Sequence, residues 1–255
     1  MDPVERLPSG QVVHETSAGE RETYARLRTL HETMVSASGE MWNWPAAATL
    51  TQPSIARILH LFDVYSRVLS VPGVICEFGS HWGAGTSVLR VLHKILEPNN
   101  RSRELHVFDT WTGFIGTGTV DRHSVDGDFF VMDGWDKELA NLLILQDAVG
   151  TAAKPPQFVL HKGDARESVH SFLQARPEAI IALAILDMDL DDPTRVVLDA
   201  LSERLVVGSV VVFDELNGPL YPGETVALRN SKFRFSKIVK SPYLPYAAYT
   251  VLEGE

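Results

Sequence analysis

The sequence contains little cysteine and too little positive charge to balance its acids. One cysteine, Cys76, stands among 255 residues, which excludes an internal disulfide framework and a thiolate zinc cluster. Cys76 lies within an apolar run, so we expect an inert buried thiol. Lysine and arginine number 23 against 33 aspartates and glutamates, which gives a net charge of −10. Because nucleic-acid binding requires a basic face, this balance argues against such a partner and favours small-molecule ligands.

Long apolar runs are also absent. No run approaches the length of a membrane span, and residues 1–6 lack the apolar core of a signal peptide. We therefore expect no membrane partner and a reducing, cytoplasmic location. Hydrophobic residues make up 45% of the chain, an ordinary share for a protein with a full core.

Strand-like and helix-like segments alternate from residue 74 onwards. Such alternation implies a doubly wound, mostly parallel α/β sheet with right-handed crossovers, of the Rossmann-like type. Two further strand-like segments predict an antiparallel C-terminal hairpin, so that the sheet has seven strands. The expected strands are 74–78, 105–108, 157–161, 180–186, 209–213, 233–240 and 246–252, and the expected helices are 86–96, 136–147, 166–176, 194–205 and 223–228.

Residues 1–70 precede this alternation and are predicted to form an N-terminal helical segment. Its first 20 residues are polar and are expected to be loosely ordered, with helices at 20–38 and 52–69. Trp42 and Trp44 lie in the break between the helices. We expect buried packing or a subunit contact for them rather than stacking on a ligand.

A glycine-rich turn follows the first strand of the expected sheet, after the acid Glu77. Glycines permit a sharp turn and the close approach of a ligand, and ligands of open sheets bind at the carboxyl ends of strands. A carboxylate there suits the cationic S-adenosylmethionine (SAM) better than a pyrophosphate, and the glycine spacing differs from the G-x-G-x-x-G of dinucleotide sites. Glycine-rich turns also end strands where no ligand binds. The expected cofactor-binding residues in this segment are Glu77, Gly79, Ser80, Gly83, Gly85 and Thr86.

Acids after the next two strands extend this site. Asp109 ends the second strand, where it could hydrogen-bond a ribose diol, and Thr110 follows it. Asp164 and Ala165 follow the third strand. Asp164 could accept a hydrogen bond from an adenine amino group or could cap the next helix, and both alternatives stay open.

Acid-rich segments also follow the fourth and fifth strands, at the same edge of the sheet. With no lysine or arginine expected nearby, such carboxylates repel one another unless a cation or protons neutralise them. Oxygen-rich sites suit Mg²⁺, although acids after strands can simply cap helices, as we expect for Asp191 and Asp192. The expected metal ligands are Asp187, Asp214 and Glu215.

Together these motifs resemble the class I SAM-dependent methyltransferases, and most closely the macrocin/mycinamicin type of magnesium-dependent sugar O-methyltransferase. The resemblance covers about residues 70–220. It departs from the family pattern at Trp111 and Thr112, which replace an aromatic residue and an acid, and at Glu215, which replaces an aspartate. The motifs that carry it are Glu77-Phe78-Gly79 with Gly83 and Gly85, residues 108–114, Asp187-Met188-Asp189 and residues 212–215.

The resemblance implies a SAM- and Mg²⁺-dependent O-methyltransferase of antibiotic biosynthesis that acts on a deoxysugar hydroxyl, with residues 71–255 as the methyltransferase domain. Within the family, the chain most resembles the nucleotide-linked rhamnose O-methyltransferases of the calicheamicin type. The resemblance also implies a homo-oligomer in which residues 1–70 provide a substrate lid or contacts between subunits. Mg²⁺ would lower the pKa of the sugar hydroxyl, and Asp187 or Asp189 would accept its proton.

Other residues in expected loops are weaker candidates for a role in the site. His81 and His123 lie in expected loops and are less favoured as the base, and residues 110–133 are expected to form a lid.

The first alternative function is a catechol-type, metal-dependent O-methyltransferase that acts on a phenolic diol. A nicotinamide-dependent reductase is disfavoured by the glycine spacing and by the lack of a plausible Tyr-x-x-x-Lys. A non-catalytic SAM-binding scaffold would have no use for the repelling carboxylates.

Overall fold

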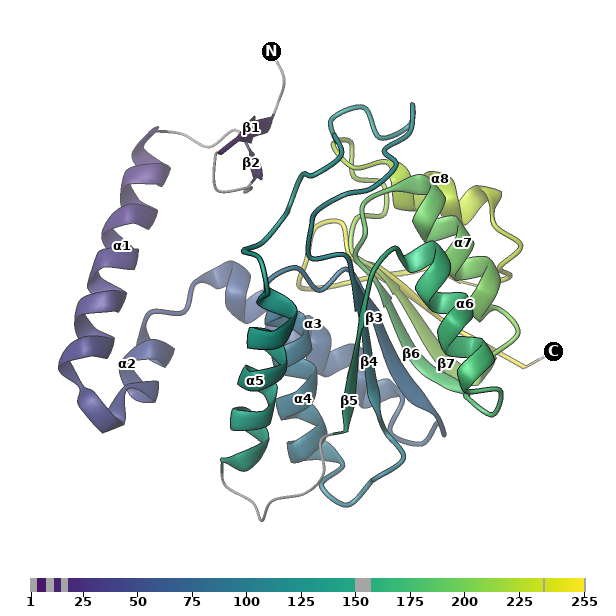
Figure 1. Cartoon of the computed structure of the whole chain (residues 1–255), viewed down its shortest axis with the longest axis horizontal. Helices are drawn as coiled ribbons and strands as arrows, with labels where there is room; N and C mark the ends of the chain where they lie inside the picture. The colour runs from purple at the N-terminus through teal and green to yellow at the C-terminus, as the bar shows by residue number, and fades with distance from the viewer. Residues whose placement is uncertain (1–3, 8–11, 15–17, 150–156, 236, 255) are drawn as a thin grey trace.

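A seven-stranded sheet forms the centre of the molecule (Figure 1). The structure is a computed structural model and describes residues 4–7, 12–14, 18–149, 157–235 and 237–254. The strand order is β5-β4-β3-β6-β7-β9-β8, in which β3 to β7 are parallel and β9 runs antiparallel to β7 and β8. The predicted doubly wound sheet with a C-terminal antiparallel hairpin is confirmed. The strands are β3 Val74–Phe78, β4 Leu105–Asp109, β5 Phe158–Lys162, β6 Ile181–Leu186, β7 Leu205–Phe213, β8 Val239–Lys240 and β9 Ala248–Val251.

Helices cover both faces of this sheet and bury two separate apolar cores. β3 and β6 are buried at every position, as expected for central strands covered on both faces. One core joins the sheet to α3, α4 and α5, and the other joins it to α6, α7 and α8. The helices are α3 Gln52–Arg67, α4 Ala84–Leu96, α5 Trp135–Ala148, α6 Ala165–Ala175, α7 Asp191–Leu201 and α8 Gly223–Asn230.

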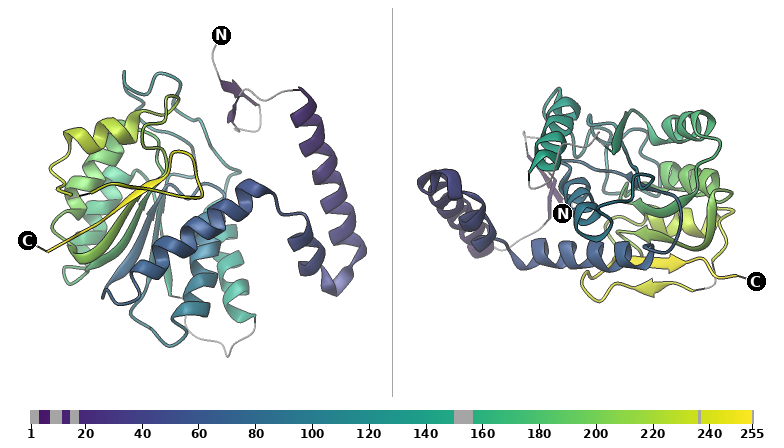
Figure 2. Two further views of the ribbon diagram at one scale, coloured as in Figure 1. Left: turned by 180° about the vertical axis from the view of Figure 1, so that it is seen from behind. Right: turned by 90° about the horizontal axis from the view of Figure 1, so that it is seen from below.

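The C-terminal hairpin is shorter than predicted. Residues 233–240 were expected to form one strand, but β8 contains only Val239 and Lys240. Phe233 instead packs into the core beside α7 and α8, which removes the first half of the segment from the sheet. The hairpin lies at one edge of the sheet, as the right-hand view of Figure 2 shows.

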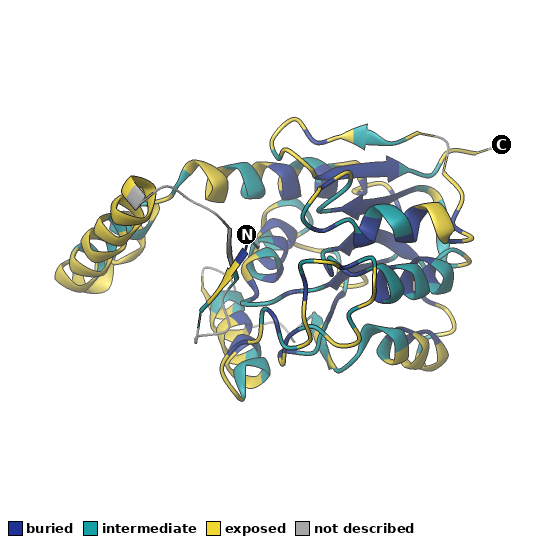
Figure 3. Ribbon diagram, turned by 90° about the horizontal axis from the view of Figure 1, so that it is seen from above, coloured by how far each residue is buried: buried dark blue, intermediate teal, exposed yellow. Residues whose placement is uncertain are grey.

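The N-terminal part stands away from the sheet (Figures 1 and 2). Helix α1 (Ala18–Ala37) and the short helix α2 (Asn43–Ala48) are mostly exposed, and Figure 3 shows α1 largely in yellow. Helix α2 and the 3₁₀ helix Gly39–Met41 replace the predicted aromatic-rich break. Trp42 and Trp44 are 56% and 69% exposed, so they are not buried within this chain, and the alternative of a subunit contact stays a prediction.

Two short stretches of the first 20 residues, which were expected to be loosely ordered, form strands, while residues 1–3, 8–11 and 15–17 lie outside the described residues. The strands β1 (Val4–Arg6) and β2 (Val12–His14) form a small antiparallel sheet of their own. In the described part of the chain, no helix is both long enough and apolar enough to cross a membrane.

Candidate active site

A pocket of about 450 Å³ opens at the edge of the sheet where the parallel strands end. Its walls are the segments that follow β3, β4, β5, β6 and β7, with α3 and the 110–134 loop on either side. All predicted site residues except Gly83 and Thr86 line it. The predicted residues that line the pocket are Glu77, Gly79, Ser80, Gly85, Asp109, Thr110, Asp164, Ala165, Asp187, Asp189, Asp214 and Glu215.

The glycines after β3 let chain segments approach one another closely. Gly79 has φ +88°, and a Cβ atom there would lie 1.7 Å from the carbonyl oxygen of Asp187. The end of β3 therefore packs directly on the end of β6, where the Asp187 amide donates to the Phe78 carbonyl at 2.8 Å. At Gly85 a Cβ would lie 2.3 Å from Oε1 of Glu77, so glycine there leaves room for this carboxyl group.

Glu77 lies buried between β3 and the first turn of α4. Its side chain is 4% exposed, and the Thr86 hydroxyl donates a hydrogen bond to Oε2. Burial raises the pKa of Glu77 to about 8, against a smaller opposite effect of the Thr86 hydrogen bond. In the ligand-free protein the neutral carboxyl is therefore favoured at neutral pH, and a bound cation would favour the carboxylate.

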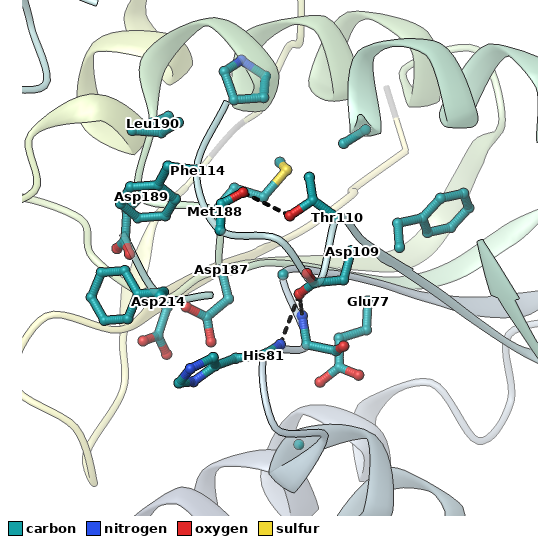
Figure 4. Close-up of a pocket in the computed structure, with 18 of the residues that line it drawn as sticks. Glu77, His81, Asp109, Thr110, Phe114, Asp187, Met188, Asp189, Leu190 and Asp214 are labelled. Atoms are coloured by element: carbon teal, nitrogen blue, oxygen red, sulfur yellow. Dashed lines mark hydrogen bonds between the residues drawn. The ribbon is translucent and has the colours of Figure 1, made fainter. Parts of the chain in front are cut away.

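Asp109 accepts hydrogen bonds from the backbone of the glycine-rich turn (Figure 4). Its Oδ2 accepts hydrogen bonds from the amides of Ser80 and His81 at 2.7 and 2.8 Å, and its Oδ1 accepts from the Trp111 amide at 2.6 Å. Oδ1 accepts only one of these bonds and keeps a second lone pair, so the predicted contact with a ribose is compatible with this role.

Asp164 is the N-cap of α6. Its Oδ1 accepts from the Arg166 amide at 2.9 Å, and the Arg166 guanidinium holds the pKa of Asp164 below its ordinary value. The capping alternative is thus confirmed, while the predicted adenine contact stays a prediction. Asp191 and Asp192 do not cap α7 as expected, because α7 begins at Asp191 and both acids lie in its first turn.

Four acids lie together where β6 and β7 end, and we call them the acid cluster: Asp187, Asp189, Asp214 and Glu215. Figure 4 shows the first three side by side. Burial, and then the neighbouring Asp214, raise the pKa of Asp187 to about 7. Burial raises the pKa of Glu215 to about 7 and raises that of Asp189 well above its ordinary value. Asp189 adopts φ +62°, an uncommon backbone conformation for a residue with a side chain.

Arg57 overturns the expectation that no basic residue lies near these acids. Its Nη2 donates to Oδ2 of Asp214 at 2.9 Å, and its Nη1 donates to Oδ2 of Asp187 at 3.2 Å. Arg57 comes from α3, far from both acids in sequence. A signal was present, because Arg57 precedes the buried His60, Leu61 and Val64 at helical spacing, and a cation on that face needs acidic partners.

Glu224 in α8 is the second residue that the sequence analysis missed. It is fully buried, and its Oε2 accepts from the Glu215 amide at 3.1 Å, which fixes the backbone of the acid cluster. Its Oε1 has no hydrogen-bond partner among the described residues. Burial raises the pKa of Glu224 well above its ordinary value.

The 110–134 loop covers the pocket with aromatic side chains. Phe129 packs between Phe114, His81 and Tyr221, with ring centroids 5.1 to 6.1 Å apart. The N-terminal strand β1 holds this loop, because Arg6 bonds Asp128 at 2.7 and 2.9 Å and also donates to the His123 carbonyl. The predicted lid therefore has an anchor outside the main sheet.

The acid cluster supplies the oxygen donors that Mg²⁺ prefers, and two of its members have pKa values raised to about 7. In this arrangement the guanidinium of Arg57 lies between two of the expected ligands. Among the described residues, no three His, Cys, Asp or Glu side chains are gathered closely enough to hold a metal ion. The acids are therefore of the kind that Mg²⁺ prefers, but in this arrangement they are not gathered into a metal site, and Arg57 supplies the positive charge.

The chain is similar to several proteins whose structures have been solved. The chain is similar to CalS11, a calicheamicin methyltransferase, at 33% identity over 94% of both chains with a TM-score of 0.84. An apo structure of CalS11, described as a TDP-rhamnose 3'-O-methyltransferase of calicheamicin biosynthesis, matches at 32% identity over 94% of this chain and 96% of that chain, with a TM-score of 0.80. The O-methyltransferase NovP has the same fold, at 19% identity over 78% of this chain and 81% of its own, with a TM-score of 0.61. No family model and no curated protein matches the chain.

Proposed function

Because the chain belongs to the class I SAM-dependent O-methyltransferases, we propose that it methylates a hydroxyl group of a nucleotide-linked deoxysugar in antibiotic biosynthesis, with Mg²⁺ as a second cofactor. The observation that carries this proposal is the likeness to a TDP-rhamnose 3'-O-methyltransferase over nearly the whole of both chains. A nucleotide-linked rhamnose is the first acceptor to test.

SAM would occupy the part of the pocket that faces the glycine-rich turn. Glu77 lies there beneath the first turn of α4, and the Asp109 carboxylate lies beside it. The remaining residues proposed to contact SAM are Gly79, Ser80, Gly83, Gly85, Thr86, Thr110, Asp164 and Ala165.

The acceptor would lie between this cofactor and the acid cluster. Asp187, Asp214 and Glu215 would hold Mg²⁺, which supplies a positive charge that lowers the pKa of the attacking hydroxyl. Asp187 or Asp189 would accept the proton. The aromatic residues of the 110–134 loop would exclude water from the pocket.

The N-terminal segment, residues 1–70, is proposed to complete the site and to form contacts between copies of the chain. Arg57 in α3 and Arg6 in β1 already link this segment to the acid cluster and to the 110–134 loop. Leu30, Met41, Trp42 and Trp44 expose large apolar side chains that a neighbouring copy would cover.

Transfer of a labelled methyl group from SAM to a panel of acceptors tests the proposal. The panel contains nucleotide-linked deoxysugars, the free sugars and catechols, each with Mg²⁺ and with a chelator. We expect labelling of a nucleotide-linked deoxysugar that the chelator abolishes. Labelling of catechols alone would contradict the proposed acceptor, and equal labelling with and without the chelator would contradict the metal.

A further inference from the structure

Arg57 already provides the acid cluster with a cation. Its guanidinium donates one hydrogen bond to Asp187 after β6 and one to Asp214 after β7, at 3.2 and 2.9 Å. These carboxylates are two of the three proposed metal ligands. The pKa of Arg57 is raised above its ordinary value, above all by the charge of Asp187.

The charge around the pocket explains why a cation is needed there. In the described part of the chain, the residues that line the pocket include seven aspartates and glutamates, and Arg57 is the one lysine or arginine among them. Without Arg57 the carboxylates at the ends of β6 and β7 would face one another with no counter-charge.

A guanidinium and a metal ion compete for the negative charge of the same two carboxylates. Mg²⁺ needs its oxygen ligands at about 2.1 Å in a near-octahedral arrangement, and Arg57 nitrogens occupy hydrogen-bond positions on both Oδ2 atoms. Two cations at this spacing also repel each other. We infer that Arg57 and a divalent cation are alternative counter-ions of Asp187 and Asp214, so that the metal binds only when the guanidinium leaves both carboxylates.

The position of Arg57 allows this exchange. The side chain is 39% exposed and belongs to α3, which packs on one face of the sheet. The inference rests on the proposed function, because it takes the two acids as metal ligands.

Binding of Mn²⁺ alone to the full chain, measured by electron paramagnetic resonance without SAM or acceptor, tests the inference. Removal of the competing charge in Arg57→Gln should tighten Mn²⁺ binding about tenfold or more. Arg67→Gln is the matched control, because Arg67 belongs to the same helix and pairs with Asp63 on the surface. Its Mn²⁺ affinity should equal that of the unmodified chain.

The outcomes separate this inference from the proposed metal site. Unchanged or weaker Mn²⁺ binding by Arg57→Gln, with binding lost in Asp214→Asn, would overturn the inference and leave the metal proposal intact. No Mn²⁺ binding by the unmodified chain or by Arg57→Gln would contradict both. The methyl-transfer assay on the unmodified chain, with its panel of acceptors, tests the proposed reaction independently.

A second measurement keeps the inference testable if Arg57→Gln does not fold. A crystal structure of the unmodified chain with Mg²⁺ at the acid cluster should show the Arg57 guanidinium released from Asp187 and Asp214. Retention of both Arg57 hydrogen bonds beside the bound ion would overturn the inference.

Discussion

Glu77 and Thr86 form a buried hydrogen bond at the point where β3 leads into α4. The Thr86 hydroxyl donates to Oε2 of Glu77, and the two side chains are 0% and 4% exposed. Burial outweighs this hydrogen bond and raises the pKa of Glu77 to about 8. The proposed cofactor site thus contains a carboxyl group whose neutral form is favoured at neutral pH when no cationic ligand is bound.

This raised pKa predicts that the ligand-free protein loses stability as the pH rises. Above the ordinary pKa of a glutamate, the folded state retains a proton that the unfolded state releases. The contribution of Glu77 to the free energy of unfolding is therefore complete below about pH 4.5. It falls by about 1.4 kcal/mol per pH unit until the pH passes about 8. Glu77→Gln removes this titration, so its free energy of unfolding should fall less steeply with pH.

Urea unfolding of the ligand-free protein at several pH values between these limits measures the two slopes. Calorimetric titration should also show that Glu77→Gln binds SAM more weakly, because the amide cannot supply a negative charge. Parallel stability curves for the two proteins would contradict the raised pKa.

Asp109→Asn should weaken both the fold and cofactor binding. The amide group of asparagine would turn an NH₂ towards backbone amides of Ser80, His81 or Trp111, which now donate to the Asp109 carboxylate. Loss of charge-assisted hydrogen bonds of this kind predicts about 2 kcal/mol of lost stability. The measurements are urea unfolding and the dissociation constant of SAM.

Asp126→Asn is the control for this substitution, because Asp126 is an exposed acid that accepts hydrogen bonds from Thr117 within the loop. It should leave SAM binding unchanged. Equal SAM affinity in Asp109→Asn and the unmodified chain would show that Asp109 neither contacts SAM nor shapes its site.

Arg6→Ala should loosen the 110–134 loop. Asp128, which is buried, would lose its ion pair, and the His123 carbonyl would lose its donor. Since Arg6 is partly exposed, the expected loss of stability is only about 1 kcal/mol. The larger effects should be faster proteolytic cleavage within the loop and a higher KM for the acceptor, with SAM affinity unchanged.

Arg21→Ala provides the comparison for Arg6→Ala. Arg21 also forms an ion pair with the N-terminal sheet, through Glu5, but both partners are exposed. Its substitution should not alter loop cleavage. If the two variants were cleaved at the same rate, the anchoring role of Arg6 would be wrong.

The parallel core was predictable from the sequence because its local signals agree with its packing. Strands such as Val74–Phe78 and Ile181–Leu186 are apolar throughout, and glycines or prolines separate them from amphipathic helices. The acids that follow these strands lie at one edge of the sheet, as the parallel topology requires. Gly79 and Gly85 proved to serve close packing within the chain, which their spacing alone does not indicate.

The missed features depend on contacts between distant segments. Arg57 and Glu224 reach the acid cluster from α3 and α8, and no pattern near Asp187 or Asp214 points to either helix. The β1–β2 sheet consists of two three-residue strands, too short for an alternation to stand out. The end of the chain departs from the predicted strand because Phe233 contributes more to the core than to the sheet edge.

The most direct test of the account is the rate of methyl transfer from SAM to TDP-rhamnose by Asp214→Asn in the presence of Mg²⁺. The account predicts a rate at least about 100-fold below that of the unmodified chain, with the dissociation constant of SAM unchanged, because the acid cluster acts on the acceptor hydroxyl. Asp63→Asn, at an acid on α3 that pairs with Arg67 away from the pocket, should retain the full rate. An unchanged rate in Asp214→Asn would contradict the role of the acid cluster in the reaction.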